Sequence, residues 1–156
     1  MTDTIDIQQS LWNALDESPF VMIRRQGDDS HAEPMTAHFD RDYCNALFFY
    51  TKRGNRIAPG GKAMAQFAAK GHGLFACLSG TLTPVADDAI VDRFWSNAVE
   101  AWYDRGRADP DLVMLRFDLD DAEIWEADTS VKGMFKLITG TRIKPGELGG
   151  HAEVAM

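Results

Sequence analysis

Residues 74–83 read LFACLSGTLT and carry the most regular alternation of apolar and polar positions in the chain. Leu74, Ala76, Leu78 and Leu82 fall on one side of an extended backbone, and smaller or polar residues fall mostly on the other. A period of two is typical of a β-strand with one face against a core. The stretch therefore predicts a long strand that is buried on one face and partly polar on the other.

Other short apolar segments precede this strand and end at residues that favour turns. We predict strands at residues 20–25 (FVMIRR), 33–39 (EPMTAHF), 46–51 (ALFFYT) and 63–69 (AMAQFAA). The polar turn QGDDSH separates the first two, which predicts a hairpin. Short links favour antiparallel pairing, because parallel strands need a long crossover.

Helical spacing appears in three places. Apolar residues on one face, with Asp6 as N-cap, predict a short helix over residues 6–15. The strongest helical pattern covers residues 87–103, where a wide apolar stripe follows two aspartates. Residues 131–138 predict a second amphipathic helix near the end of the chain.

The remaining segments complete a single domain. Residues 112–117 and 122–126 predict two strand pieces joined by an acidic DLDD turn, and residues 139–156 have the Gly, Pro and charge content of a loose tail. A chain of 156 residues suits one core. We therefore predict an α+β, mainly β fold: one domain over residues 1–156, with its core at about 11–138, in which an antiparallel sheet closes into a barrel with flanking helices.

Charge and composition argue against several classes of protein. A net charge of −8 disfavours binding to nucleic acid or to an anionic membrane. No stretch approaches the roughly 20 apolar residues of a membrane helix, and the N-terminus has no apolar run of an export signal. Cys44 and Cys77 form no CxxC pair, so we expect reduced thiols in a soluble cytoplasmic protein.

Motifs for several common sites are missing from the sequence. The four histidines are not spaced as a metal-binding pair, so no metal site is expected. There is no GxSxG motif and no glycine-rich phosphate loop of the Walker or dinucleotide type. No catalytic residue is assigned from the sequence.

One long segment of this acidic protein lacks acids altogether. No Asp or Glu lies between Asp42 and Asp87, whereas five cations do: Lys52, Arg53, Arg56, Lys62 and Lys70. A buried sheet core would account for the missing acids, because carboxylates are rarely buried. It accounts less well for the clustered cations at 52–56, which indicate a local anion site.

The cations cluster where a predicted strand ends, in TKRGNR at residues 51–56. Arginine offers a planar fork of donors and lysine a mobile charge, and Thr51 and Asn55 add neutral hydrogen bonds. Such a turn can wrap a phosphate monoester. The alternative is a solvated basic turn that ends a hairpin.

From about Leu11 to Ile138 the chain contains, in order, FVMIRR, EPMTAHF, ALFFYTKRGNR, AMAQFAAKGHGLFACLSGTL, IVDRFW with AWYDRG, and DLVMLRFD with AEIW. These segments resemble the general stress protein branch of the pyridoxamine 5'-phosphate oxidase-like FMN-binding split-barrel family. KGHGLFACLSGTL, followed by the Trp-rich helix and AEIW, is the most specific part.

The resemblance implies a six-stranded split barrel that forms a homodimer, with FMN, or FAD as an alternative, at the subunit interface. It maps ring and ribityl contacts to Met35, Thr36, Ala37, Phe49, Tyr50 and Thr51, and phosphate contacts to Lys52, Arg53, Asn55 and Arg56. Lys62 is a substitute phosphate ligand, because IAPGGK stands where relatives place a short helix. Trp125 maps to the ring system, or to core or interface packing.

The resemblance leaves more than one function open. Trp125 is followed by Glu126 and Ala127 rather than by the basic motif of true pyridoxamine-phosphate oxidases, so that activity is not expected. A flavin-dependent oxidoreductase, with NAD(P)H as a reductant, is the first hypothesis. The alternatives are a non-catalytic stress protein that sequesters flavin, and a structural dimer with a differently filled or empty cleft.

Overall fold

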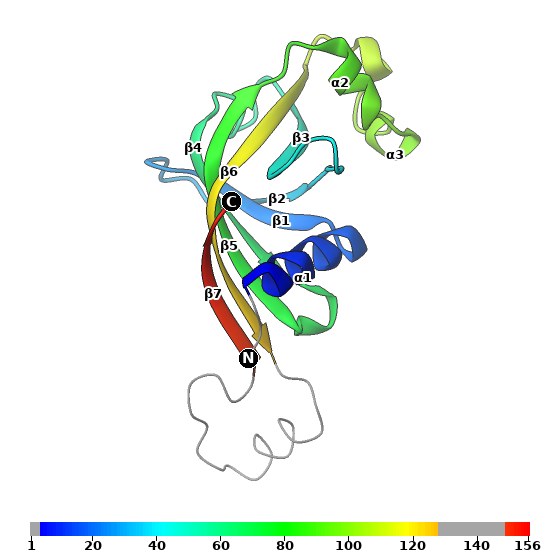
Figure 1. The fold of residues 1–156 in the computed structure, drawn as a ribbon. Helices are drawn as coiled ribbons and strands as arrows, with labels where there is room; N and C mark the ends of the chain where they lie inside the picture. The colour runs from blue at the N-terminus through cyan, green and yellow to red at the C-terminus, as the bar shows by residue number, and fades with distance from the viewer. Residues whose placement is uncertain (1–3, 128–148) are drawn as a thin grey trace.

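The computed structural model describes residues 4–127 and 149–156. Its described part contains one seven-stranded antiparallel sheet, in which β7 pairs with β6 outside the main strand order β2-β1-β4-β5-β6-β3. The strands are β1 (Phe20–Arg25), β2 (Glu33–Thr36), β3 (Ala46–Lys52), β4 (Gly61–Ala68), β5 (Leu74–Pro84), β6 (Leu112–Ala127) and β7 (Gly149–Ala155) (Figure 1). The helices are α1 (Thr4–Glu17), α2 (Asp88–Arg93) and α3 (Asn97–Glu100), with 3-10 turns η1 (Lys70–His72) and η2 (Gly106–Ala108). The predicted α+β, mainly β class is confirmed.

Two backbone features make the sheet a split barrel. His38 and Phe48 exchange hydrogen bonds of 2.9 and 2.7 Å, so the segment after β2 joins β3 and brings the two ends of the sheet together. Strand β6 pairs with β3 along residues 112–118 and with β7 along residues 121–127. The long strand β6 therefore belongs to the barrel at one end and to a sheet extension at the other.

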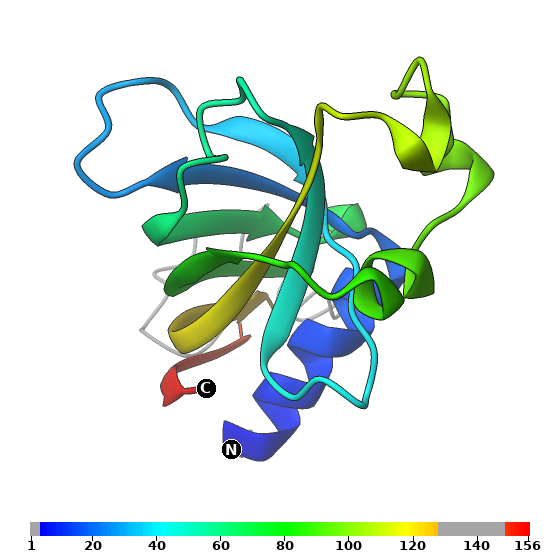
Figure 2. The same cartoon turned by 90° about the horizontal axis from the view of Figure 1, so that it is seen from above.

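The barrel interior is filled by the inward side chains of the strands and by one face of α1. Ile7, Leu11 and Leu15 of α1 are at most 1% exposed, and α1 crosses one side of the barrel (Figure 1). Helices α2 and α3 project to one side, beyond β3, when the barrel is seen from above (Figure 2). Within the described residues no helix is long and apolar enough to span a membrane.

The predicted helix over residues 87–103 is wrong, because the structure has two short helices there. The hydroxyl of Ser96 accepts a hydrogen bond from the Val99 amide and caps α3. Serine at such a position offers the backbone an alternative to a continuing helix. The break lets Phe94 stack on Phe48 of β3, with ring centroids 5.1 Å apart.

The predicted turn at DLDD is also wrong, because β6 runs through it as one strand. A bulge takes up the extra residue: Ser79 pairs with Asp121, whereas Gly80 pairs with Leu119. A Cβ on Gly80 would lie 2.2 Å from the carbonyl oxygen of Asp118. Glycine at this position lets β5 and β6 approach closely.

The C-terminal segment differs from the predicted loose tail, and it adds a strand to the predicted six. Residues 149–155 form β7, and Val154 is 5% exposed. The edge of β6 beyond β3 carries unpaired backbone groups, which β7 satisfies. The helix predicted at residues 131–138 lies outside the described residues.

Candidate functional site

A cavity of about 920 Å³ lies among the end of β2, the end of β3 and the α3 segment. Its lining residues come from three stretches of chain: Pro34, Met35, Thr36 and His38; Tyr50, Thr51, Lys52, Gly54 and Asn55; and Ser96, Ala98, Val99, Trp102, Tyr103 and Asp111. Cavities that bind small molecules are commonly about 300–1,000 Å³. The cavity is thus large enough for a cofactor-sized ligand.

Two tyrosines connect the barrel to the helical wall of the cavity. The Tyr50 hydroxyl donates to the Val91 carbonyl of α2, and the Tyr103 hydroxyl donates to the Thr51 carbonyl at 2.9 Å. Burial raises the pKa of Tyr50 and that of Tyr103 to about 12. Both phenols therefore stay protonated near neutral pH and act as hydrogen-bond donors.

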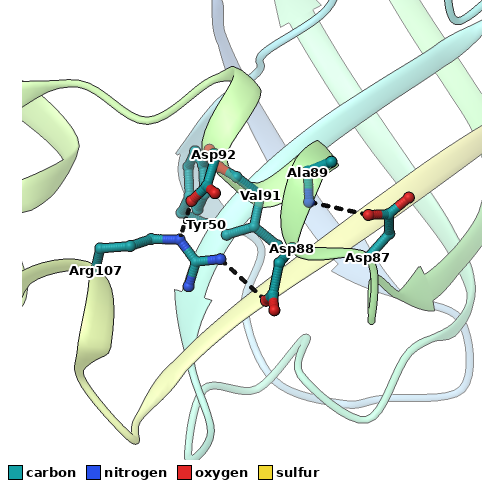
Figure 3. Close-up of polar contacts among 7 residues, drawn as sticks. All are labelled: Tyr50, Asp87, Asp88, Ala89, Val91, Asp92 and Arg107. Atoms are coloured by element: carbon teal, nitrogen blue, oxygen red, sulfur yellow. Dashed lines mark hydrogen bonds and ion pairs between the residues drawn. The ribbon is translucent and has the colours of Figure 1, made fainter.

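Ion pairs hold α2 in place above these rings. The Arg107 guanidinium donates to Asp92 at 2.6 Å and to Asp88 at 3.1 Å (Figure 3). Asp87 caps the same helix by accepting from the Ala89 amide at 2.9 Å. These contacts fix the helix whose Val91 carbonyl orients the ring of Tyr50.

His38 lines the cavity beside the aromatic rings, and the sequence analysis did not single it out. Its ring lies edge-on to Tyr50, with centroids 5.2 Å apart, and 6.0 Å from that of Phe94. Burial lowers the pKa of His38, so the imidazole is neutral at pH 7. Its ring nitrogens make no hydrogen bond to any described residue, so they are available to a ligand.

One end of the cavity carries two donors that make neither a hydrogen bond nor an ion pair to the described residues. Lys52 is exposed, and its ammonium lies 5.8 Å from the Tyr103 ring centroid without an ion pair to any described residue. Thr51 is 5% exposed, and its hydroxyl likewise makes no hydrogen bond in the described part of the chain. This end is suited to an anionic or hydrogen-bond-accepting group.

The other predicted phosphate ligands are only partly gathered here. Asn55 lines the cavity, although its side-chain oxygen already accepts from the Ile57 amide at 2.9 Å. Arg53 donates to the Pro110 carbonyl, and Arg56 donates to the His31 carbonyl and pairs with Glu33 at 3.6 Å. Neither arginine lines the cavity.

Lys62 does not line the cavity either, because it lies at the start of β4, opposite Thr81. The basic side chains in and after the end of β3 have different neighbours. Although Lys52, Arg53 and Arg56 are close in sequence, they do not surround one ligand.

Of the residues predicted to contact the flavin ring and ribityl chain, some line the cavity and others do not. Met35, Thr36, Tyr50 and Thr51 line the cavity. Ala37 and Phe49 are buried in the barrel core instead. Phe49 packs against Phe117 inside the barrel, with ring centroids 6.2 Å apart, so its ring does not reach the cavity.

Trp125 lies near the far end of β6, away from the cavity lining of its own chain. It pairs with Phe75 of β5 and with His151 of β7, and its ring stacks on His151 with centroids 5.4 Å apart. Any contact between Trp125 and a ligand in the cavity would have to involve another copy of the chain.

The helical wall contributes further cavity residues that the sequence analysis missed. Val99 and Tyr103 are buried, whereas Trp102 is 75% exposed. The prediction of one continuous helix placed all three in a stripe against the sheet. A large apolar side chain that is exposed beside a cavity can mark a binding site. The helical pattern of the sequence does not show that Trp102 is exposed.

Known proteins share this architecture. A candidate general stress protein 26 from Jannaschia sp. CCS1 is 27% identical over 99% of this chain and 100% of that chain, with a TM-score of 0.80. A general stress FMN/FAD binding protein from Xanthomonas citri is 39% identical over 82% of this chain and 94% of that chain, with a TM-score of 0.74. An FMN binding, pyridoxamine 5'-phosphate oxidase-related protein from Nostoc punctiforme shares the fold at 12% identity over 100% of this chain and 99% of that chain, with a TM-score of 0.60.

A comparison with curated proteins found no match. The model of the family described as pyridoxamine 5'-phosphate oxidase like matches residues 6–144. That match spans most of the barrel, both short helices and the strand ends that line the cavity. The chain therefore belongs to the pyridoxamine 5'-phosphate oxidase-like family.

Proposed function

We propose that the protein binds FMN in the cavity between β3 and α3. The observation that carries the proposal is an aromatic wall beside an end that holds two donors, Lys52 and Thr51, which make no hydrogen bond or ion pair to any described residue. The Xanthomonas citri protein, at 39% identity, is named for FMN/FAD binding, which supports a flavin as the ligand. FMN is preferred to FAD because the cationic end suits a terminal phosphate.

The residues present fit the chemistry of FMN. Its planar ring system suits the apolar and aromatic side of the cavity, which includes Met35 and Tyr50. The ammonium of Lys52 suits the phosphate, and the carboxylate of Asp111, which also lines the cavity, suits the ribityl hydroxyls as an acceptor. Neutral His38 adds a group that can donate or accept a hydrogen bond at the ring edge.

Oxidoreductase activity is the first function that we propose for the bound cofactor. When bound, FMN supplies hydride and electron-transfer chemistry, and the protein supplies position and electrostatics. The hydroxyls of Tyr50 and Tyr103 connect the two walls of the cavity.

Storage of flavin without turnover is the second function. Both cavity phenols donate to backbone carbonyls and have a pKa of about 12, so neither is a ready proton donor. Anaerobic mixing of the FMN-loaded protein with NADPH or NADH separates the two functions. Bleaching of the flavin supports the oxidoreductase, and no reduction over hours supports storage.

The binding site is tested by titrating the protein with FMN and with riboflavin, which lacks the phosphate. Lys52→Met removes one charged donor and should weaken FMN binding about 10- to 100-fold, from the usual strength of charged hydrogen bonds. Riboflavin binding should hardly change. Arg53→Met is the matched control, because Arg53 is adjacent in sequence but does not line the cavity. Equal losses for both ligands, or for both variants, would show that the phosphate lies elsewhere.

We further propose a homodimer that covers the outer face of the sheet. Phe20, Phe75 and Trp125 are 60%, 42% and 41% exposed. Phe20 pairs with the cavity residue Thr36, and Phe75 pairs with Trp125. A second copy on this face would therefore also reach the mouth of the cavity, and its Trp125 could supply the predicted ring contact.

Light scattering after gel filtration tests the dimer. The wild-type protein should have twice the mass of one chain, and Phe75→Glu should yield monomers that bind FMN more weakly. Gln26→Glu introduces the same charge in an exposed turn and should leave the dimer intact. A wild-type monomer that binds FMN with full affinity would contradict the dimer while leaving the flavin site standing.

A further inference from the structure

Three metal-ligating side chains meet on the outer face of the sheet, apart from the cavity. Glu123 lies on β6, and His151 and Glu153 lie on β7. One ligand atom from each lies within 4.8 Å of the other two. His151 Nε2 lies 3.5 Å from Glu123 Oε1.

The strand register explains why these side chains meet. Glu123 is directly opposite Glu153 in the antiparallel pair, and His151 is opposite Trp125. Two like charges directly opposite each other destabilise a strand pair. Within the described residues, His151 is the only basic side chain that pairs with either glutamate, and it does so with Glu123. A bound cation would relieve this repulsion and use all three side chains.

The ligand set indicates which cation. Imidazole nitrogens and carboxylate oxygens are both Zn²⁺ ligands, with bonds of about 2.0–2.2 Å. Neighbouring ligands in such a tetrahedral shell are about 3.3 Å apart, which is close to the His151–Glu123 approach of 3.5 Å. Ca²⁺ and Mg²⁺ bind through oxygen ligands, so the imidazole favours a transition metal.

A neighbouring side chain orients the imidazole. The Trp125 ring stacks on His151, with centroids 5.4 Å apart and 30° between the planes. Residues outside the coordination shell that fix a ligand ring strengthen metal binding. The glutamates are partly exposed, at 33% for the Glu123 side chain, so they can rotate to close the remaining separation.

We propose that Glu123, His151 and Glu153 form a binding site for one Zn²⁺ ion that joins β6 to β7. Strand β7 pairs with β6 alone among the described strands, so an ion here would anchor the C-terminal strand to the barrel. The spacing of the histidines along the chain gives no sign of this site. Here one ligand comes from β6 and two from β7, and strand pairing alone brings them together.

The test uses the untagged full-length chain after treatment with EDTA, titrated with ZnCl₂ by calorimetry. One ion per chain should bind. Loss of a side chain that only supports a metal ligand typically weakens metal binding about 10- to 100-fold. Removal of a ligand itself, by His151→Ala or Glu153→Gln, should therefore weaken binding at least about tenfold. His72→Ala and Glu126→Gln are matched controls on an exposed histidine and on a β6 glutamate outside the cluster. MgCl₂ at the same concentration should give no binding.

A stability measurement complements the titration. Zn²⁺ should raise the Tm of the wild-type protein and of both controls, but not that of the ligand variants. Binding should weaken in acid, because protons compete for the ligands. Glu153→Gln preserves the size of the side chain, so it tests the site even if His151→Ala folds poorly. Zn²⁺ binding that survives both ligand substitutions, or no binding below about 1 mM, would overturn the proposal. Neither result would bear on the Lys52→Met test of FMN binding, because Lys52 lines the cavity and lies outside the cluster.

Discussion

The two faces of β3 belong to two different kinds of structure. Phe49 faces the barrel interior and packs against Phe117, with ring centroids 6.2 Å apart. The adjacent Phe48 faces a smaller cluster, in which it stacks on Phe94. The barrel cluster draws its buried residues from α1 and from all seven strands or their flanking segments, whereas the smaller cluster lies under α2 at one side of the barrel.

The two regions also differ in what holds them. The barrel interior gains stability from buried apolar area, at about 25 cal/mol per Å². The α2 segment packs on the smaller cluster through Val91 and adds partly exposed ion pairs of Arg107 and Arg93, and exposed pairs contribute about 0–1 kcal/mol each. The barrel therefore contributes most of the free energy of unfolding. The helical segment contributes less, and its role is to form one wall of the cavity.

The largest expected effect comes from the barrel. Phe117 is 0% exposed, and truncation of a buried Phe to Ala costs about 3–5 kcal/mol. Phe117→Ala should lower the free energy of unfolding by about that amount in urea denaturation. Met64→Ala, at a position 39% exposed on the outer face, should cost much less. Similar losses for both would remove the distinction between the interior and the surface.

An intermediate effect is expected where the two regions join. Tyr103→Phe removes the hydroxyl that donates to the buried Thr51 carbonyl, and an unpaired buried acceptor costs about 1–3 kcal/mol. Urea denaturation should show that loss, together with weaker FMN binding. Tyr43→Phe is the control, because the Tyr43 hydroxyl makes no hydrogen bond to any described residue. A neutral Tyr103→Phe would mean that the helical wall does not depend on this contact.

A smaller effect on global stability is expected at the ion pairs. Arg107→Met should cost less than about 1 kcal/mol in unfolding, because its partners are exposed. Amide hydrogen exchange in α2 should nevertheless become faster, and FMN binding should become weaker, because α2 loses its two ion pairs with Arg107. High salt should mimic the substitution. Arg105→Met, outside these pairs, should change neither. A loss as large as that of Phe117→Ala would place α2 within the barrel's cooperative unit.

The smallest effect concerns pH at the cavity. Burial lowers the pKa of His38 in the folded protein below its usual 6.5. Between the folded and unfolded pKa values the unfolded chain binds more protons, so stability falls as the pH drops below about 6.5 and is unaffected above it. His38→Gln should remove this component, whereas exposed His31→Gln should not. Urea denaturation at pH 5.5 and 7.5 provides the measurement, and an identical pH dependence in the wild-type protein and His38→Gln would contradict it.

The sequence by itself determined the features that depend on short-range patterns. The alternation at residues 74–83 and the basic turn after Thr51 appear where they were predicted, and the hairpin forms as predicted except that β2 ends at Thr36 rather than at residue 39. A strand with one buried face needs a two-residue period wherever its partners lie, so the pattern can be recognised locally. The family resemblance then identified the strand ends from which most of the cavity's barrel side is built.

Only the tertiary structure decided which neighbours in sequence act together. Lys52 faces the cavity, whereas Arg53 and Arg56 bond to distant backbone carbonyls, and no local pattern distinguishes them. The 87–103 segment breaks so that its aromatic residues can pack on β3, and β7 forms because β6 offers an unpaired edge. Each outcome depends on burial and hydrogen bonding between segments far apart in the chain, which a single sequence does not display.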